Sequence, residues 1–289
     1  MTTSRPSHPS SGPLLRAVRG LLLACHPGPT AAVTVLVTAL AVASGRDAAG
    51  CALVAAAVLT GQLSIGWCND AVDAARDAAA GRTGKPVASG AVSVRTVWAA
   101  AIAALALCVP LSLASGPAAG AVHLVGVAAA WAYDLGLKAT VLSWLPYAVG
   151  FGSLPGFVTL GLPGHPWPAW WAVTAAALLG CGAHLANVLP DIPADLAGGV
   201  RGWPQRLGVA RVRVLIPVPL LAATALLVFG PPEQPGVGGW AALAAAVAFT
   251  IGGPALGRGS SRVPFAAAIA VAAVDVVLLL ARGTAITAP

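Results

Sequence analysis

Charged side chains are scarce in this sequence: they make up 9% of its 289 residues, against the roughly 25% of an average soluble domain. So little charge excludes an ordinary water-soluble globular protein. The charges are also unbalanced, with 16 Lys and Arg against 9 Asp and Glu. A nucleic-acid-binding surface would combine clustered bases with stacking aromatic residues. Here the bases are spread over short segments between apolar stretches, so we expect no nucleic-acid partner.

Cysteine is also rare, with five residues and no pair in a C-x-x-C pattern. The sequence therefore predicts neither a disulfide framework nor a zinc site. Most of the cysteines fall in apolar stretches, where cysteine serves as a small packing residue.

Apolar residues, in contrast, make up 58% of the chain. A helix needs about 20 residues to cross the hydrocarbon core of a membrane, and apolar runs of that length recur along the sequence. We predict an all-α, polytopic membrane helix bundle of about nine transmembrane helices, with eight as the alternative because two runs are nearly continuous. The predicted spans are residues 28–45, 50–68, 96–115, 118–137, 139–160, 168–190, 209–230, 237–256 and 263–281.

The polar, Ser- and Pro-rich start of the chain predicts a disordered cytoplasmic tail over residues 1–20. Residues 21–289 then form a single transmembrane domain. With nine spans and the N-terminus inside, all but two of the 16 Lys and Arg fall on the cytoplasmic side, the exceptions being Arg46 and Arg282. This satisfies the positive-inside rule and predicts a multi-pass protein of the cell membrane.

Two short windows at predicted cytoplasmic helix ends hold five of the nine acidic residues. In each window, polar side chains recur at positions i, i+4 and i+8, a spacing that places them on one face of a helix. The first ladder, which also includes an aspartate at i+1, consists of Asn69, Asp70, Asp73 and Asp77. The second ladder consists of Asn187, Asp191 and Asp195.

A constant offset superimposes the second ladder and its following loop on the first. The matched pairs are Asn69 with Asn187, Asp73 with Asp191, Asp77 with Asp195, Gly81 with Gly199, Pro86 with Pro204, Gly90 with Gly208, and Arg95 with Arg213. This register indicates an internal duplication of two four-helix halves, followed by one additional helix. Such an arrangement would bring the two ladders face to face.

A single aspartate at a helix end is commonly just solvated at the interface. Aspartates within a membrane cost about 2.5–3.5 kcal/mol each at a helix centre, so two matched ladders favour a function. Opposed carboxylates repel each other and require a cation between them. Oxygen ligands without His or Cys favour a hard ion, and Mg²⁺ characteristically joins one or two carboxylates to substrate phosphates. The ladders therefore predict a Mg²⁺ site for a diphosphate.

Basic residues follow each ladder and could bind diphosphate oxygens. They also fit the positive-inside bias, which remains the alternative for any one of them. The residues are Arg76, Arg82 and Lys85 after the first ladder, Arg201 and Arg206 after the second, and Lys138 at the end of the fourth predicted helix.

These patterns resemble the UbiA superfamily of intramembrane prenyltransferases. The first ladder reads as the family's N-D-x-x-D-x-x-x-D signature, and residues 85–90 are similar to its K-x-P-x-x-S-G loop. Asp191 and Asp195 resemble the second signature, D-x-x-x-D, and residues 199–208 are similar to the element that trails it. Tyr133, followed by Leu-Lys, also fits. The departures are Trp203 in place of Leu, Arg201–Gly202 in place of Lys-x-Thr, and the prolines beside Asp191.

The resemblance implies a Mg²⁺-dependent enzyme that ionises a prenyl diphosphate and passes the prenyl group to an aromatic or other lipophilic acceptor, with its site facing the cytoplasm. Membrane lipid surrounds it, and no obligatory protein partner is indicated. Two alternatives stay open: a membrane terpene cyclase of the same superfamily, and a transporter or lipid-binding protein without enzymatic activity.

The expected roles follow from the ladders and the resemblance. The metal ligands are Asp70, Asp73, Asp77, Asp191 and Asp195; the catalytic residues are Asp73, Asp191, Lys138 and His184; and the diphosphate contacts are Asn69, Arg76, Arg82, Lys85, Tyr133, Asn187, Arg201 and Arg206. His184 lies one turn before Asn187 and is a candidate general base, with a packing role as the alternative. Trp67 and Tyr147 are expected to anchor helices at the membrane interface rather than to stabilise a carbocation.

Overall fold

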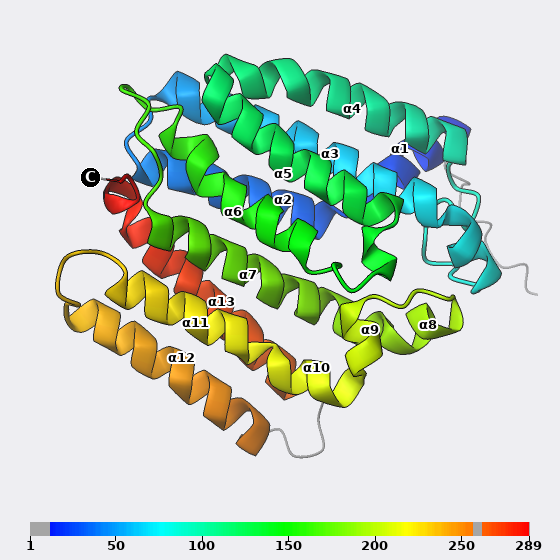
Figure 1. Ribbon diagram of the computed structural model, residues 1–289. Coiled ribbons are helices and arrows are strands. Elements are labelled where there is room, and N and C mark those ends of the chain that lie inside the picture. Colours follow the sequence, from blue (N-terminus) through cyan, green and yellow to red (C-terminus); the bar gives the residue numbers. More distant parts are fainter. Residues whose placement is uncertain (1–11, 257–261, 289) are drawn as a thin grey trace, which may run out of the picture.

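The computed structural model describes residues 12–256 and 262–288, and in these residues every regular element is a helix. The predicted all-α class is therefore confirmed, with one isolated bridge between Pro168 and Thr287 as the sole extended pairing in the described chain. The helices lie side by side in a bundle (Figure 1). The first part of the chain forms α1 (Pro13–Ala24), α2 (Pro27–Ala43), α3 (Ala48–Ala79), α4 (Val94–Ala114), α5 (Pro117–Leu135), the 3₁₀ turn η1 (Leu137–Ala139) and α6 (Leu145–Thr159).

The second part of the chain contains more short elements than the first. Its helices are α7 (Trp170–Val188), η2 (Leu189–Asp191), α8 (Ile192–Ala197), α9 (Trp203–Leu207), α10 (Val209–Leu215), α11 (Pro217–Phe229), α12 (Val237–Leu256), α13 (Arg262–Ala281) and η3 (Gly283–Ala285). The short elements η2, α8, α9 and α10 gather at one end of the bundle (Figure 1).

Each of the nine predicted spans coincides with a long helix or helix pair in the described chain. Among the described residues, five helical segments are long and apolar enough to cross a membrane, or six if the bent pair α1–α2 counts as one span. The protein is thus an integral membrane protein, while the count of nine spans stays a prediction. Two predicted spans differ in detail. Residues 139–160 become helical only from Leu145, and residues 209–230 divide into α10 and α11 at Pro217, whose missing N–H cannot continue a helical ladder.

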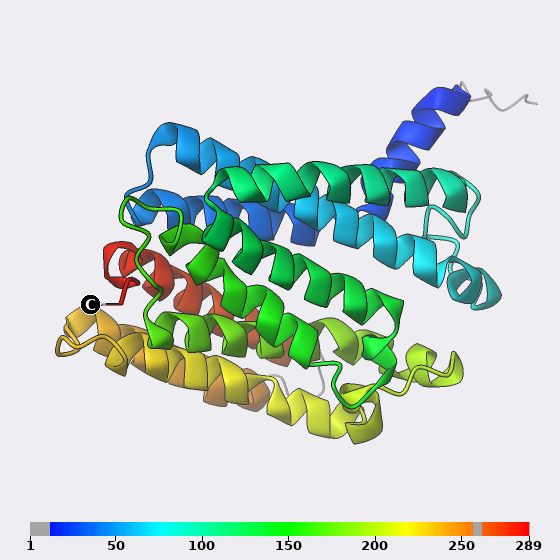
Figure 2. The same cartoon turned by 45° about the horizontal axis from the view of Figure 1, so that its top comes forward.

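The N-terminal segment becomes helical earlier than predicted. Residues 1–11 of the predicted tail lie outside the described residues, but α1 starts at Pro13 and is inclined at 59° to α2. Figure 2 shows α1 projecting from the bundle. The indole N–H of Trp67 on α3 donates to the Leu21 carbonyl oxygen at 2.9 Å. A Cβ on Gly66 would lie 2.3 Å from the Cys25 carbonyl oxygen, so this close approach of α1 to α3 requires glycine.

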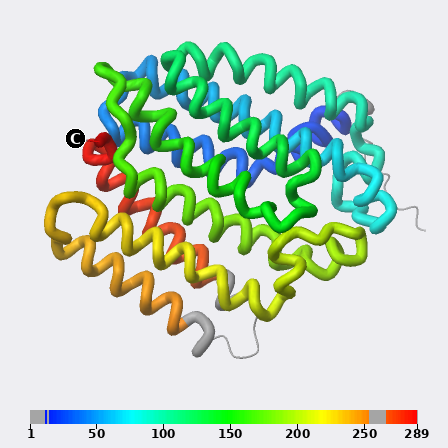
Figure 3. Tube along the Cα trace, viewed as in Figure 1, coloured from blue at the N-terminus to red at the C-terminus, as the bar shows by residue number. Residues whose placement is uncertain are grey.

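Buried apolar side chains of α2, α3, α6, α7, α11 and α13 form one continuous core. In the tube view, α13 runs beside α7 and α11, which it also contacts (Figure 3). The residues after α13 fold back onto the bundle, where the Ala169 N–H donates to the Ile286 carbonyl oxygen at 2.6 Å. These contacts hold α13 and the residues after it against α7 and α11.

The length of α3 positions the first ladder. The helix has 32 residues and is roughly 48 Å long at 1.5 Å per residue, whereas a hydrocarbon core is about 30 Å thick. Asp47 accepts a hydrogen bond from the Gly50 N–H at 2.7 Å and caps the opposite end. Asp70 lies roughly 33 Å along the axis from Ala48. The ladder therefore begins where a spanning helix would leave the hydrocarbon.

Candidate diphosphate site

The three aspartates of the first ladder are buried at the end of α3, with 1% of Asp70, 8% of Asp73 and 2% of Asp77 exposed. Each one is paired with a cation. Lys138 Nζ donates to Asp73 Oδ1 at 2.5 Å, and an Arg76 guanidinium nitrogen lies 2.7 Å from Asp73 Oδ2. The predicted site residues Lys138 and Arg76 are therefore brought directly onto the middle carboxylate of the ladder.

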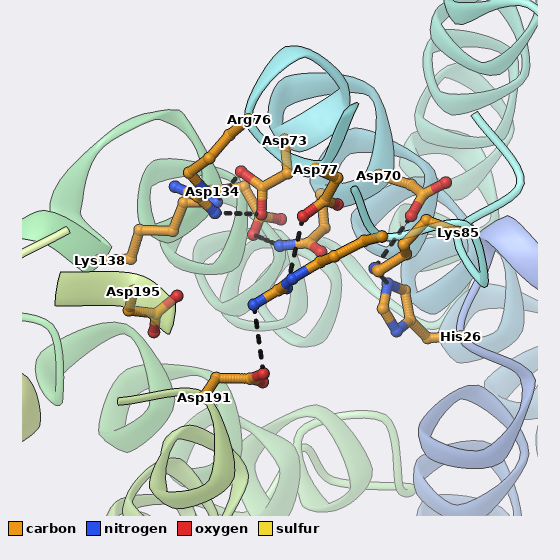
Figure 4. A network of polar contacts seen from close by, with 12 residues as sticks. His26, Asp70, Asp73, Arg76, Asp77, Lys85, Asp134, Lys138, Asp191 and Asp195 are labelled. Atoms are coloured by element: carbon orange, nitrogen blue, oxygen red, sulfur yellow. Dashed lines mark hydrogen bonds and ion pairs between the residues drawn. The ribbon is translucent and has the colours of Figure 1, made fainter. Parts of the chain in front are cut away.

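Lys85, in the loop after α3, donates to Asp70 Oδ1 at 3.0 Å. The same ammonium lies 3.4 Å from Nε2 of His26, in the break between α1 and α2. Burial and the Lys85 charge lower the pKa of His26, while the nearby Asp70 carboxylate acts in the opposite direction. A neutral imidazole can accept a hydrogen bond from Lys85, so the N-terminal segment contributes to the site (Figure 4).

Arg82 connects the two predicted ladders. One terminal nitrogen lies 3.3 Å from Asp77 Oδ1, and the other lies 3.4 Å from Asp191 Oδ1. Figure 4 shows Asp191 and Asp195 facing the aspartates of α3 across a short gap. The structure therefore places carboxylates from both windows at one site, as the sequence predicted.

The second window is less regular than the first, as the prolines beside Asp191 indicated. Asn187 is on α7, Asp191 ends η2 and Asp195 is on α8, because Pro190 and Pro193 interrupt the regular helix. The Asp191 carboxylate is also less enclosed: 53% of its side chain is exposed, against 11% for Asp73. The two windows therefore differ, because the first is buried on one long helix and the second is more exposed and lies on short elements.

The bases after the second window lie farther from the aspartates. Arg206 donates from Nε to the Arg201 carbonyl oxygen at 2.8 Å, and both side chains are exposed. In the described chain, neither one takes part in an ion pair. Asp195 instead accepts from Gln205 Nε2 at 2.9 Å. The structure thus does not join Arg201 and Arg206 to the cluster formed by the other predicted bases.

His184 is buried on α7 beside two tyrosines. Its ring centroid lies 4.9 Å from that of Tyr147 and 5.7 Å from that of Tyr133. Its Nε2 lies 3.2 Å from Ser143 Oγ, while its buried Nδ1 has no partner among the described residues. Tyr147 accepts a hydrogen bond from Asn187 Nδ2 at 3.2 Å, so it belongs to this aromatic group rather than serving only as an interface anchor.

Four residues of the site were missed by the sequence reasoning: His26, Asp134, Ser143 and Gln205. Asp134 could have been found, since an aspartate in a predicted span is a functional candidate by itself. It is 3% exposed and accepts from Asn69 Nδ2 at 2.7 Å. The others carry no sequence signal, because a lone His, Ser or Gln acquires its role only from tertiary contacts.

Paired glycines of the proposed repeat share an unusual backbone conformation. Gly81 and Gly199 have φ values of 66° and 80°, and Gly90 and Gly208 have φ values of 73° and 81°. This left-handed region is open to glycine at little cost. The loops that follow the two carboxylate windows therefore turn at equivalent positions, as a duplication requires.

The donor set suits a hard divalent ion, because it consists of carboxylate and amide oxygens, and Asp70 Oδ2 is buried without a partner among the described residues. Within the described chain, no three His, Cys, Asp or Glu side chains are grouped closely enough to hold a metal ion. The reason is visible in the contacts above: lysines and arginines separate the carboxylates. The predicted role of the five aspartates as metal ligands stays a prediction.

The same signatures are found when the whole chain is compared with known families. The sequence model of the UbiA prenyltransferase family matches residues 30–273, which include both carboxylate windows and most of the helices. The chain belongs to the UbiA prenyltransferase family. The resemblance inferred from the two aspartate motifs is thereby confirmed.

Two relatives of this chain have names that indicate different reactions. The chain is 30% identical over 198 residues to the bacteriochlorophyll synthase 33 kDa chain of Cereibacter sphaeroides, covering 61% of each protein. It is 32% identical over 185 residues to the 1,4-dihydroxy-2-naphthoate octaprenyltransferase of Mycobacterium tuberculosis, covering 58% of this chain and 61% of the relative. The match thus spans about three fifths of the length of these curated relatives.

Solved structures share the fold. A digeranylgeranylglyceryl phosphate synthase structure has a TM-score of 0.70 at 14% identity, covering 93% of this chain and 99% of the other. A UbiA homolog from Archaeoglobus fulgidus, bound to GPP and Mg²⁺, has a TM-score of 0.66 at 16% identity with the same coverage. A homolog from Aeropyrum pernix reaches 23% identity at a TM-score of 0.66, covering 84% of this chain and 97% of the other. The helix bundle is therefore that of the family.

Proposed function

We propose that this protein is a Mg²⁺-dependent intramembrane prenyltransferase, which ionises a prenyl diphosphate and transfers the prenyl group to an aromatic or other lipophilic acceptor. The observation that carries the proposal is the cluster in which four cations from the α3–α4 loop, α3 and η1 neutralise buried aspartates opposite Asp191 and Asp195. Membership of the family supports it, as does the structure of the Archaeoglobus fulgidus homolog bound to GPP and Mg²⁺.

The cluster can exchange its internal ion pairs for contacts with a diphosphate. Arg76, Arg82, Lys85 and Lys138 each hold N–H groups on a carboxylate that a diphosphate oxygen could receive instead. Removing these cations would leave the aspartates facing one another, and their mutual repulsion would then favour a divalent cation. Protein cations and metal would therefore be redistributed together when a Mg²⁺-diphosphate binds.

The four bases would stabilise the leaving group. When the bond between prenyl C1 and the diphosphate oxygen breaks, both electrons stay with the diphosphate and its negative charge grows. Bound Mg²⁺ would act as a Lewis acid toward the same oxygens. Lys138 is the base best placed to follow this change, because it is only 9% exposed and is held by Asp73 in a site with little water to screen its charge.

The acceptor would then form the new bond to C1 and lose a proton. His184 is our candidate for the proton acceptor, with its unpartnered Nδ1 and its Nε2 held by Ser143. The rings of Tyr133 and Tyr147 pack around it and offer π faces on which an allylic cation is stabilised. The name of the 1,4-dihydroxy-2-naphthoate octaprenyltransferase, a relative of this chain, agrees with an aromatic acceptor.

The proposal also includes the side of the membrane. Both basic loops flank the cluster end of the bundle, whereas Arg46 lies before α3 at its other end. By the positive-inside rule, the cluster would face the cytoplasm, where prenyl diphosphates and Mg²⁺ are soluble.

The test is diphosphate release by the purified full chain in lipid nanodiscs, measured with prenyl diphosphates of increasing length, with Mg²⁺ or with EDTA. We expect release only with Mg²⁺, and a prenylated product only when an aromatic acceptor is added. A cyclic product from the prenyl diphosphate alone, formed when a double bond of the prenyl chain captures the cation, would identify a terpene cyclase instead. Absence of release from every diphosphate, with binding retained, would favour the transporter or lipid-binding alternative and overturn the proposal.

A further inference from the structure

Asp134 is a buried carboxyl group on α5, in contact with the cluster but outside every ion pair of the described chain. Only 3% of the residue is exposed, and its Oδ2 has no hydrogen-bond partner among the described residues. An aspartate in an apolar helix carries a cost of about 2.5–3.5 kcal/mol on insertion scales. The polar contact that the structure describes for Asp134 therefore indicates its role.

That contact is with the first residue of the aspartate motif. Asn69 Nδ2 donates to Asp134 Oδ1 at 2.7 Å, between a buried carboxyl group and a partly buried amide. A primary amide can turn over by rotation about its last side-chain bond, which exchanges its donor and acceptor sides. A carboxylate oxygen accepts hydrogen bonds, so Asp134 fixes the NH₂ side of Asn69 toward α5.

Because Asp134 holds the NH₂ side of Asn69, the amide oxygen lies on the opposite side of that amide group. Asn69 directly precedes Asp70 on α3, and Asp70 is the ion-pair partner of Lys85. Figure 4 shows Asp134 beside Asp73 at the cluster. The amide that Asp134 holds is thus the sequence neighbour of a carboxylate of the cluster.

We propose that Asp134 is a positioning residue for the diphosphate site: it orients Asn69 so that the amide presents oxygen, and never N–H, to the cationic side of the cluster. The inference rests on the proposed function and adds to it a residue outside both aspartate motifs. A reversed amide would place N–H donors against Lys85 and against any bound divalent cation. Residues behind a metal site that orient its ligands typically change affinity or activity by about 10–100-fold when removed.

The experiment measures binding of Mg²⁺ with inorganic diphosphate by calorimetry, and kcat and KM for geranyl diphosphate, using the full chain in nanodiscs. The variants are Asp134→Asn, Asp134→Ala, Asn69→Ala and the double alanine variant. Asp134→Ala is expected to weaken binding by about 10–100-fold. Asp134→Asn is expected to lose less than Asp134→Ala, because its amide oxygen can still accept from Asn69, but more than the wild type, because its NH₂ group can also donate to a reversed Asn69 amide. In the Asn69→Ala background, Asp134→Ala is expected to add no further loss.

Equal losses from Asp134→Ala with and without Asn69 would overturn the proposal, as would an Asp134→Asn variant as impaired as Asp134→Ala. Asp275→Ala is the matched control, since it removes another buried carboxyl from a membrane helix, on α13, where Asp275 is 0% exposed. Its binding of Mg²⁺ with diphosphate should be unchanged.

A second comparison applies if Asp134→Ala does not fold. Asn69→Asp places two carboxyl groups against each other, and adding Asp134→Asn restores a donor and an acceptor with their positions exchanged. Binding should recover at least about tenfold in the double variant relative to Asn69→Asp alone, and no recovery would sink the idea. Because the probe is inorganic diphosphate, this coupling remains measurable even if the wild type turns over no prenyl substrate, so failure of the proposed function is recognised separately.

Discussion

Asp73 is the residue on which most of the cluster depends. Its two oxygens separately receive Lys138 and Arg76, which come from η1 and from the next turn of α3. The same carboxylate is the middle position of the first motif. Asp73 thus pairs with cations from two elements and, in the proposed mechanism, also binds the metal.

Asp73→Asn should reduce Mg²⁺-dependent diphosphate release by at least about 100-fold, because the amide keeps a hydrogen-bond acceptor but loses the charge that a metal and Lys138 require. The free energy of unfolding should fall by only about 1–3 kcal/mol, the usual cost of weakening a buried hydrogen bond to a charged group. Turnover and thermal unfolding of the purified variant give the two values.

Asp275→Asn is the control for this change. Asp275 is buried on α13 and accepts from Thr224 Oγ1 at 2.5 Å, so the replacement is the same and the location is different. Near-normal turnover of Asp73→Asn, or an equal loss of turnover in Asp275→Asn, would contradict the proposed binding of Mg²⁺-diphosphate at the aspartate cluster.

Arg82 joins the two carboxylate windows through contacts of 3.3 Å and 3.4 Å, with 30% of its side chain exposed. Its partner Asp77 is buried, so Arg82→Gln removes the ion pair of an enclosed carboxylate and should lower the free energy of unfolding by about 1–3 kcal/mol. The KM for a prenyl diphosphate should rise about tenfold, since one charge-assisted hydrogen bond to the diphosphate is lost. Steady-state kinetics over a range of substrate concentrations will measure it.

Arg206→Gln is the control for the KM predicted for Arg82→Gln. Arg206 contacts the Arg201 carbonyl oxygen and lies away from the aspartates, so its KM should change less than that of Arg82→Gln. If Arg206→Gln is equally damaging, the α8–α9 segment closes over the substrate and the sequence-based assignment of Arg206 is right.

At the scale of elements, the connection between η1 and the loop before α9 positions Lys138, the cation that the proposed mechanism uses most. A Cβ on Gly202 would lie 2.3 Å from the Lys138 carbonyl oxygen, and the Trp203 N–H donates to Ser143 Oγ at 3.1 Å. Ser143 in turn contacts His184 on α7. Short connecting segments therefore position Lys138 and supply the hydrogen-bond partner of His184.

Gly202→Ala should lower the free energy of unfolding by about 1–3 kcal/mol, because the added methyl group displaces backbone atoms rather than a flexible side chain. Diphosphate release should fall as well, since Lys138 must shift. Gly84→Ala is the matched control: Gly84 lies in the other loop, and a Cβ there has no atom within 4 Å. Unchanged stability of Gly202→Ala, measured by thermal unfolding beside Gly84→Ala, would contradict the close packing described here.

At the scale of the whole molecule, both carboxylate windows and their basic loops lie at one end of the bundle (Figures 1 and 4). Reporter fusions inserted beside Arg82 and beside Arg206 should both report the cytoplasmic side, and a fusion beside Arg46 should report the opposite side. Placing either of the first two outside would refute the proposed orientation of the site.

Much of this organisation was predictable from the sequence, because it depends on the length of apolar runs and on spacing within single helices. The spans followed from the length of apolar runs, which the thickness of a membrane dictates, and each predicted range holds a helix or helix pair of the described chain. The first ladder was predicted correctly because no proline interrupts α3, so its helical spacing remains regular. The second window is less regular because Pro190 and Pro193 divide it among α7, η2 and α8, the interruption that these prolines indicated in the sequence.

The sequence by itself determined the membrane helices, the two aspartate motifs and the bases that follow them, since these depend on composition and on spacing within single segments. Only the tertiary structure decided which cation meets which carboxylate: Lys138 on Asp73, Lys85 on Asp70, and Arg82 between two windows. It also decided that Asp134 meets Asn69, on a different helix. The physical reason is that buried charges must be paired at distances of a few ångströms, and those distances arise from helix packing between segments far apart in the chain.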